Sequence, residues 1–405
     1  MTKLLFNPFD PAFRADPYPF YDELRREEPV HVSAIGSIVL SRYEDVVATL
    51  RSNDFSRDIE ANATPADPGQ MLRRQLRRER LRDGTAAKTI LNLDPPDHTR
   101  LRRLVSLAFT PTAIERLRPR IQTLVDEVLD RAAARGEMEL VDELAFPVPF
   151  QVISELLDMP TERADELRHW SQILTAALEP TTDEAGIAAA DEAGRQMGHY
   201  VSEVIEQRRR HPGDDLLSAL IAAEESGDRL SFAELRAFVT LLYVAGHETT
   251  VNLIGNGTLA LLRNRDQLAR WRDDPSIGTK AVDELLRFDG PVQLTVRVPI
   301  VPVRFGDVEV EPGTVVMALL GAANHDPAMF ADPHELHLDR PNAGRHLAFS
   351  AGIHYCLGAS LARLEADVAI GSLVRRFPTL ELLEEPSWRD RLTIRGVDRL
   401  PLAVA

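Results

Sequence analysis

The sequence lacks several features that would assign it to common classes of protein. It has a single cysteine among 405 residues, so no disulfide can form within the chain, and we expect a reducing cytoplasm as its location. It has no run of roughly 20 apolar residues that could span a bilayer, and its N-terminus lacks an apolar stretch of signal-peptide length. A net charge of −16 argues against binding nucleic acid through bulk charge. We therefore expect no membrane and no nucleic-acid partner.

Internal repeats and low-complexity linkers are also missing, so nothing in the sequence divides the chain. Hydrophobic residues make up 44% of it and charged residues 27%, which is typical of a globular protein with a large core. Apolar residues recur at helical spacing over most of the chain up to residue 288, and short β-like runs occur at 38–41 and 301–316. The pattern predicts a mainly α fold with small β-sheets, in a single domain covering residues 1–405.

The longest predicted helix runs from Ser231 to about Arg263. Ser231 and Glu234 form an S-x-x-E capping box at its start, and at about 1.5 Å per residue it would be on the order of 48 Å long. Its apolar centre nevertheless contains Gly246 and Glu248. A glycine inside a helix costs about 1 kcal/mol relative to alanine. Local violations of this kind tend to mark functional positions.

The only cysteine, Cys356, lies in the stretch FSAGIHYCLG, directly before another predicted helix. The N–H groups and dipole of a helix N-terminus stabilise a thiolate. Gly352 and Gly358 would let the backbone approach a flat ligand closely. The usual role of a lone cysteine is that of a small buried apolar residue, and taken alone the stretch favours that structural role.

Three further motifs carry residues that could support chemistry. In LDPPDHTRLRR, His98 and Arg102 lie four residues apart and so share one helix face. The central helix contains AGHETT, and Glu284 and Arg287 form an E-x-x-R pair. Each motif also has a purely structural explanation. LDPPDHTRLRR could be only a turn and a helix start, and AGHETT only a kinked core helix with a buried acid. The E-x-x-R pair could be a solvated ion pair of little energetic value.

Taken together and in this order, these motifs resemble those of the cytochrome P-450 family. The cysteine stretch is similar to the family's haem-ligand loop F-x-x-G-x-H-x-C-x-G, with Ser350 where glycine is common. AGHETT resembles the oxygen-activation motif A-G-x-[DE]-T. The resemblance runs from about Asp16 to Leu400 and is weakest at 58–89 and 176–193. It implies the cytochrome P-450 fold, with the long central helix crossing the haem.

The resemblance implies a haem b cofactor, iron protoporphyrin IX, with the cysteine as its metal ligand. A thiolate under the iron pushes electron density towards it and favours O–O cleavage. The haem-binding residues would be His98, Arg102, Ala245, Arg297, Phe349, Gly352, His354, Cys356 and Gly358. The structural network that holds the haem loop would be Glu284, Arg287 and Arg340. The substrate contacts would be Leu242, Ala245, Val292, Leu294 and Ile394.

The activity implied by the resemblance is that of a monooxygenase. One atom of O₂ would enter a C–H bond (hydroxylation) or a C=C bond (epoxidation) of a small apolar or moderately polar organic molecule. Thr249 and Glu248 would be the catalytic pair, the first as a hydrogen-bond donor and the second as a proton relay. No flavin domain follows the motifs, so we expect electrons from NAD(P)H through ferredoxin reductase and ferredoxin. The ferredoxin would dock on a basic patch of Arg100, Arg103 and Arg363, and we expect a monomer.

Two alternatives remain open at this point: a peroxygenase driven by hydrogen peroxide, and a non-catalytic protein that binds haem or a ligand. Neither needs a proton relay to O₂, so the pair Glu248 and Thr249 argues against both. The arginine-rich segment 73–82 falls in a region that the resemblance assigns to the substrate pocket. A solvated basic face explains that segment better than a site for an acidic substrate.

Overall fold

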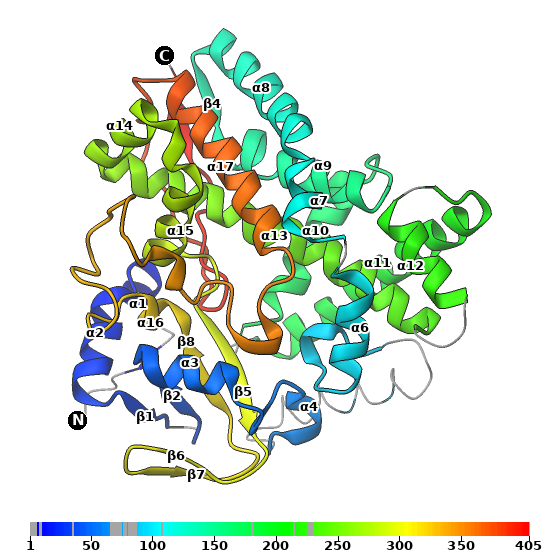
Figure 1. Ribbon diagram of the computed structural model, residues 1–405, viewed down its shortest axis with the longest axis vertical. Coiled ribbons are helices and arrows are strands. Elements are labelled where there is room, and N and C mark those ends of the chain that lie inside the picture. Colours follow the sequence, from blue (N-terminus) through cyan, green and yellow to red (C-terminus); the bar gives the residue numbers. More distant parts are fainter. Residues whose placement is uncertain are drawn as a thin grey trace.

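The computed structural model describes residues 6–404 apart from 8–9, 35, 65–74, 76–78, 80–86, 107, 180–181, 214 and 226–229 (Figure 1). The α-helices are α1 Pro11–Ala15, α2 Tyr18–Glu27, α3 Tyr43–Arg51, α4 Ile59–Asn62, α6 Asp97–Val105, α7 Pro111–Glu115, α8 Arg118–Arg135, α9 Pro147–Leu156, α10 Ala164–Ala176, α11 Glu184–Arg210, α12 Leu216–Glu225, α13 Phe232–Arg263, α14 Arg265–Asp273, α15 Gly278–Asp289, α16 Leu320–Asn324 and α17 Ala359–Arg376. The shorter helical turns are η1 Ile90–Asn92, η2 Val141–Ala145, η3 Pro275–Ile277, η4 Ala343–Arg345 and η5 Gly352–His354. The strands are β1 Val30–Val32, β2 Ile38–Leu40, β3 Phe55–Ser56, β4 Glu137–Glu139, β5 Leu294–Pro299, β6 Val303–Phe305, β7 Val308–Val310, β8 Val316–Leu319, β9 Glu381–Leu382 and β10 Pro401–Ala403.

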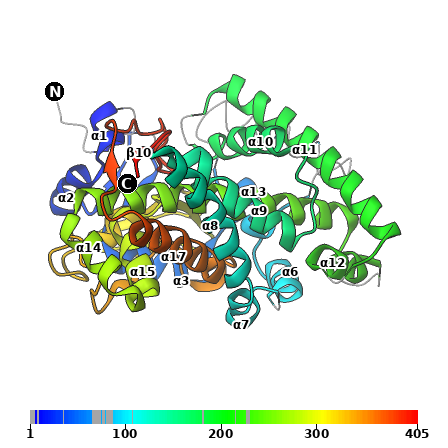
Figure 2. The ribbon, with the colours of Figure 1, turned by 90° about the horizontal axis from the view of Figure 1, so that it is seen from above.

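The central helix α13 begins and ends where the sequence predicts. The Ser231 hydroxyl accepts a hydrogen bond from the Glu234 backbone N–H at 3.2 Å, and the Glu234 carboxylate accepts one from the Ser231 N–H at 2.8 Å. This reciprocal capping box satisfies two N–H groups that the helix cannot pair internally. The helix packs against α9, α11, α15 and α17, and Figure 2 shows it passing through the middle of the molecule. The prediction of a long central helix is confirmed.

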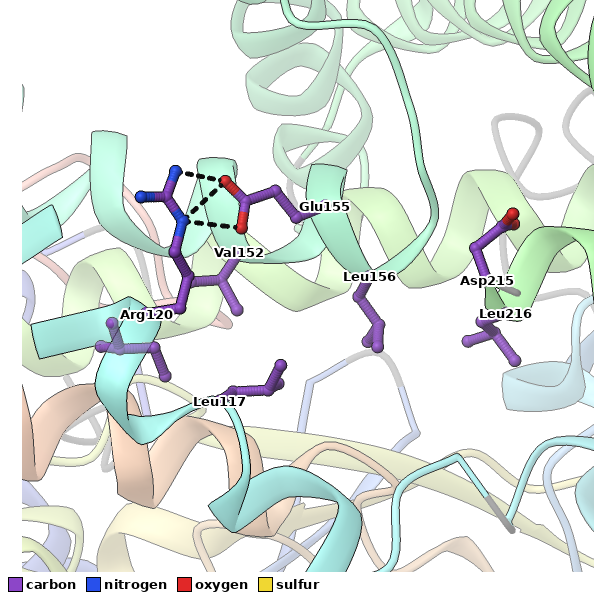
Figure 3. A pocket seen from close by; sticks show the side chains of 8 residues that line it. Leu117, Arg120, Val152, Glu155, Leu156, Asp215 and Leu216 are labelled. Atoms are coloured by element: carbon purple, nitrogen blue, oxygen red, sulfur yellow. Dashed lines mark hydrogen bonds and ion pairs between the residues drawn. The ribbon is translucent and has the colours of Figure 1, made fainter. Parts of the chain in front are cut away.

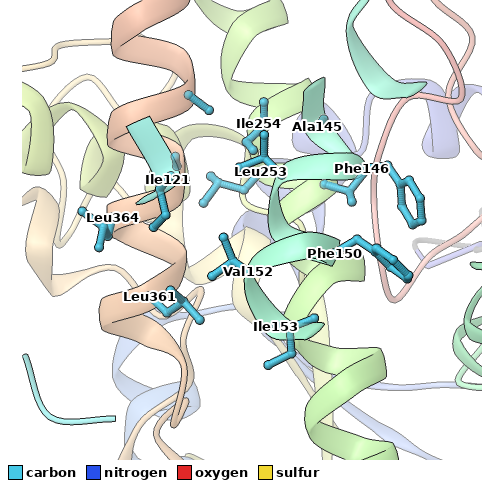
Figure 4. Packing of buried hydrophobic residues seen from close by; sticks show 14 of the residues in the cluster. Ile121, Ala145, Phe146, Phe150, Val152, Ile153, Leu253, Ile254, Leu361 and Leu364 are labelled. Carbon is cyan, nitrogen blue, oxygen red and sulfur yellow. The ribbon is translucent and has the colours of Figure 1, made fainter. Parts of the chain in front are cut away.

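The core beneath the cysteine stretch is built by α8, α9, α13 and α17. Figure 4 shows Leu361 of α17 on the side of Val152 of α9, and these two residues share one buried cluster with Leu364 of α17 and Leu253 of α13. Truncating one such leucine to alanine would cost about 2–5 kcal/mol, because the surrounding side chains cannot fully close the cavity. Since α17 starts immediately after the cysteine stretch, this packing fixes one end of that stretch.

The larger sheet has the strand order β1-β2-β8-β5-β3, with β2 and β8 parallel and the other neighbours antiparallel. The predicted strand at 38–41 is β2. The predicted paired strands at 301–316 are the hairpin β6–β7, which turns at Gly306 with φ of +56°, while β8 begins only at Val316. A second sheet, β4-β10-β9, joins the C-terminus to the end of α8. The predicted mainly α fold with small sheets is confirmed.

Two further expectations from the sequence concern membrane-spanning helices and the arginine-rich segment. Within the described part of the chain, no helix combines the length and the apolar character needed to cross a membrane. The arginine-rich segment 73–82 lies almost wholly outside the described residues, so its expected basic face stays a prediction.

Candidate functional site

The cysteine stretch is held in a tight, non-repetitive conformation. The Cys356 N–H donates to the Phe349 carbonyl at 3.0 Å, which closes the loop, and Ser350 and Gly352 both have positive φ, at 62° and 70°. Gly352 passes so close to α3 that an added Cβ would lie 2.4 Å from the Leu50 carbonyl oxygen. Only glycine fits there. Helix α17 begins at Ala359, so the cysteine precedes a helix N-terminus as the sequence predicts.

Cys356 combines surface exposure with a desolvated environment. The residue is exposed, yet burial among surrounding protein atoms raises the pKa of its thiol. The Gly358 N–H and the charges of Arg102 and Arg363 act in the opposite direction, lowering the pKa. A side chain that is accessible and also desolvated faces an internal space rather than the outer surface. An added Cβ on Gly358 would contact nothing within 4 Å, which agrees with open space on that side of the loop.

A cluster of cations adjoins the cysteine stretch. Burial, together with the charge of Arg57, lowers the pKa of Arg297 to about 9, and burial lowers the pKa of Arg57 to about 10. Arg102 donates to the Tyr355 carbonyl at 2.6 Å. Asp94 offsets part of the charge by raising the pKa of both Arg57 and Arg297. Like charges gathered in a desolvated space are unfavourable unless an anion joins them.

Two histidines complete this cluster. The rings of His98 and His354 lie 4.4 Å apart between centroids, and the buried Nε2 atom of each has no hydrogen-bond partner among the described residues. Burial, with Arg297 as the next cause, lowers the pKa of His354 to about 3, so this imidazole is neutral at physiological pH. Unpaired nitrogens beside excess positive charge suit an anionic ligand. The two propionates of haem b meet that requirement, so the residues present fit the cofactor that the sequence implies.

The motif on α13 presents two different faces. Ala245 is exposed although its neighbours Tyr243, Val244, His247 and Glu248 are buried, which places Ala245 against an internal space. The Thr249 hydroxyl donates to the Ala245 carbonyl at 3.1 Å within the helix. These two predicted residues therefore lie one turn apart on one side of α13.

Gly246 and His247 pack against other helices. An added Cβ on Gly246 would lie 3.0 Å from Ile153 Cγ1, so the glycine permits the close approach of α9. His247 is fully buried among Phe146, Phe150 and Tyr243, and its Nδ1 lies 2.7 Å from the Tyr243 carbonyl oxygen. Burial lowers the pKa of His247, which makes it a neutral core residue.

The five expected substrate contacts are not all equivalent. Ala245 is exposed, Val292 is half-buried and pairs with Ile394 across an isolated β-bridge, and Leu242 is 9% exposed. Leu294 is 3% exposed and packs in an apolar cluster with Phe13, Val39 and Leu319, and Ile394 is 4% exposed. Burial therefore does not separate these two residues, and all five substrate contacts stay predictions.

The E-x-x-R pair is a buried network rather than a solvated ion pair. Arg287 donates to both carboxylate oxygens of Glu284, at 2.7 and 2.8 Å, and Arg340 Nε donates to the same carboxylate at 3.0 Å. All three side chains are at most 5% exposed. The two guanidinium groups also donate to backbone carbonyls of residues 324 and 331–335. One carboxylate thereby fixes a long irregular segment to α15.

This network reaches the cysteine stretch through two links. The Asn324 side-chain oxygen accepts from the Leu347 N–H at 2.7 Å, while the Asn324 carbonyl accepts from Arg287. Asp283, next to Glu284 on α15, accepts from Arg363 Nε at 2.6 Å, and the Arg363 guanidinium lies 4.7 Å from the Phe349 ring centre. Both ends of the cysteine stretch are thus tied to α15.

A separate surface pocket lies between α8, α9 and α12 (Figure 3). Leu117, Val152 and Leu216 form its apolar wall, and Arg120 pairs with both carboxylate oxygens of Glu155 at one end. Neither Cys356 nor the α13 motif lines it, so it is distinct from the candidate site.

Arg57 was not identified from the sequence. It follows β3, whose Ser56 pairs with Val298 of β5, and this register brings Arg57 beside Arg297. Because the pairing joins segments more than 240 residues apart, no local pattern in the sequence indicates it.

Comparisons with known proteins agree with this geometry. The family model described as Cytochrome P450 matches residues 69–274 and 277–392. Cytochrome P450 107B1 of Saccharopolyspora erythraea is 44% identical over 97% of this chain and 96% of its own length. The vitamin D(3) 25-hydroxylase of Pseudonocardia autotrophica is 40% identical, covering 98% of this chain and 96% of its own. The crystal structure of ligand-free CYP164A2 from Mycobacterium smegmatis is similar with a TM-score of 0.90 and 41% identity over 99% of both chains.

The buried network yields a stability prediction. Glu284→Ala leaves Arg287 and Arg340 without their shared counter-ion, and we expect a loss of about 3–5 kcal/mol in the free energy of unfolding, with little haem-loaded protein recovered. Urea titration and the haem-to-protein absorbance ratio measure both effects. Glu335→Ala is the control, because that side chain is 67% exposed, and we expect a change within about 0.5 kcal/mol. Equal stability of the two variants would contradict the network's role.

The positive φ of Ser350 yields a second prediction. A non-glycine residue at φ of 62° is strained, and its buried hydroxyl has no hydrogen-bond partner among the described residues. Ser350→Gly should raise the free energy of unfolding by about 1 kcal/mol, measured by urea titration of the haem-loaded protein. Ser360→Gly in the first turn of α17 should lower it by a similar amount, since helix dihedrals favour other residues over glycine. A destabilised Ser350→Gly variant would show that the serine side chain is needed there.

Proposed function

The chain belongs to the cytochrome P450 family of monooxygenases, and from that membership we propose the following reaction. One atom of O₂ enters a C–H or C=C bond of a small apolar or moderately polar organic molecule, with electrons from NAD(P)H delivered through ferredoxin reductase and ferredoxin. The observation that carries the proposal is the acid–alcohol pair Glu248 and Thr249, placed one turn from the exposed Ala245 on an otherwise buried helix.

Each part of the site has a separable role. When bound, the haem supplies a redox-active iron, whose thiolate ligand favours O–O cleavage. Arg102, Arg297, His98 and His354 would bind the propionates and hold the cofactor in orientation. The apolar helices around Ala245 keep bulk water away from the reacting centre.

Thr249 and Glu248 manage the protons that O₂ reduction consumes. The Thr249 hydroxyl is within reach of the internal space and can exchange its bond to the Ala245 carbonyl for one to a ligand. Glu248 is 2% exposed, and its Oε2 atom has no hydrogen-bond partner among the described residues, so the carboxylate has capacity for a water-borne proton. A peroxygenase or a non-catalytic haem protein would have no use for this pair, which supports the O₂-dependent reaction over both alternatives.

The relatives and the pocket residues together favour an apolar substrate. One relative is named for hydroxylating vitamin D(3), which supports a hydroxylation of an apolar molecule in this chain too. We propose Leu242, Ala245, Val292, Leu294 and Ile394 as its contacts. We also propose that the chain acts as one domain and as a monomer. The single cysteine supports a location in the reducing cytoplasm.

The ferredoxin would dock on the cysteine side of the molecule. Two arginines expected in its docking patch are already paired: Arg100 with Asp97 and Glu234, and Arg363 with Asp283. Arg103 is exposed on α6, and Ile353 is 43% exposed on the cysteine stretch. We propose that docking combines Arg103 with this apolar contact, and that it is less dependent on salt than a patch of three arginines would be.

The function is tested by the coupling of product to NAD(P)H. Thr249→Ala should bind haem and substrate as the parent does, yet lower the product formed per NAD(P)H severalfold and release hydrogen peroxide instead. Thr250→Ala is the matched control, because this neighbouring hydroxyl is buried and points back to the Gly246 carbonyl at 3.4 Å. The substrate is first identified by the shift it causes in the haem Soret band. If Thr249→Ala couples as tightly as Thr250→Ala, the oxygen-activation role is wrong.

A further inference from the structure

The C-terminal segment 388–398 packs directly on α13 beside the motif. Trp388 pairs with Val397 across a β-bridge, and an added Cβ on Gly396 would lie 1.9 Å from the Asn252 side-chain oxygen. Asn252 in turn donates to the Glu248 carbonyl at 2.9 Å. This segment, remote from the motif in sequence, therefore forms part of the surroundings of Glu248.

Arg389 brings a positive charge from this segment to Glu248. Its Nη1 atom lies 3.7 Å from Glu248 Oε2, within ion-pair distance but beyond hydrogen-bond length. Its Nε atom lies 3.3 Å from Asp398 Oδ1, and the Asp398 side chain is 57% exposed. The arginine thus lies between a buried carboxylate and one at the surface.

Two other titratable groups near Glu248 are His247 and Arg391. His247 Nε2 lies 3.9 Å from Glu248 Oε1, but burial lowers the pKa of His247, so this imidazole is neutral. Arg391 also interacts electrostatically with Glu248. Its guanidinium, however, donates hydrogen bonds to Thr175 Oγ1 at 3.0 Å and to the Gln172 carbonyl at 3.1 Å. Arg389 is the cation that forms an ion pair with Glu248.

The position of Arg389 is fixed by contacts with α10. Glu179, just beyond α10 and 6% exposed, accepts backbone hydrogen bonds from Leu392 at 2.8 Å and from Thr393 at 2.9 Å. The Arg389 N–H donates to the Gly396 carbonyl at 2.9 Å. These bonds hold the turn that carries Arg389 beside the C-terminal end of α10.

We infer that Arg389 is a positioning residue for Glu248: its guanidinium, anchored by Asp398, holds the buried carboxylate in the orientation from which it passes protons. The buried Oε2 atom of Glu248 has no hydrogen-bond partner among the described residues, so a nearby charge is needed to constrain the carboxylate. This inference rests on the proposed O₂-activating role of Glu248.

A double-mutant cycle tests whether Arg389 acts through Glu248. Turnover is measured for the parent, Arg389→Ala, Glu248→Gln and the double variant, with the substrate identified by its Soret shift and a saturating ferredoxin system. We expect Arg389→Ala to lower kcat about tenfold in the parent and less than twofold in the Glu248→Gln background. KM for the substrate should stay unchanged. Arg389→Lys, which keeps the charge, should recover half or more of kcat, and Arg399→Ala is the control for removing an exposed arginine near the same segment.

Crystal structures of the haem-loaded parent and Arg389→Ala give a readout independent of turnover. The Glu248 carboxylate should lie within about 4 Å of the guanidinium in the parent and rotate away in the variant. Where alanine lowers the yield of folded protein, Arg389→Gln replaces it, with the same expectations. An equal loss of kcat in both backgrounds, or an unmoved carboxylate, would overturn the inference. If Glu248→Gln itself turned over normally, the proposed function of Glu248 would fail instead.

Discussion

The carboxylate of Glu284, buried between two guanidinium groups, is the contact on which the site's geometry depends. A charge in this position has no access to water, so it is stable only while both Arg287 and Arg340 remain in place. Their remaining N–H groups in turn satisfy carbonyls of an irregular segment that has no sheet or helix partners of its own. The hydrogen bond from the Leu347 N–H to the Asn324 side chain links this network to the stretch that carries the cysteine.

The site itself is organised by charges that the protein alone does not balance. Arg57, Arg102 and Arg297 gather beside two imidazoles with unpaired nitrogens, and burial lowers the pKa of both Arg57 and Arg297. The two carboxylates of haem b would offset this excess positive charge, which would couple cofactor binding to the stability of this region. On α13 the protein supplies its own counter-charge, because the buried Glu248 faces Arg389 of the C-terminal segment.

Much of this arrangement could be predicted from the sequence where the signal is local. The capping box gave the start of α13, the glycines around Cys356 indicated a tight loop before a helix, and Ser350 marked a position whose backbone favours glycine. The remainder depends on long-range pairing. Arg57 reaches the cation cluster through strand register, and Arg389 reaches Glu248 only because the C-terminus folds back over α13.

The central claim is that Cys356 supplies a thiolate to the haem iron, and the spectrum of the reduced carbon monoxide complex tests it most directly. Because Cys356 is the only cysteine, Cys356→Ser removes every thiol from the chain with a change of one atom. The parent should show the strongly red-shifted Soret band of a thiolate-ligated haem, since a serine oxygen cannot supply the same electron donation. Cys356→Ser should lose that band. A parent without the red shift, or a variant that keeps it, would contradict the assignment.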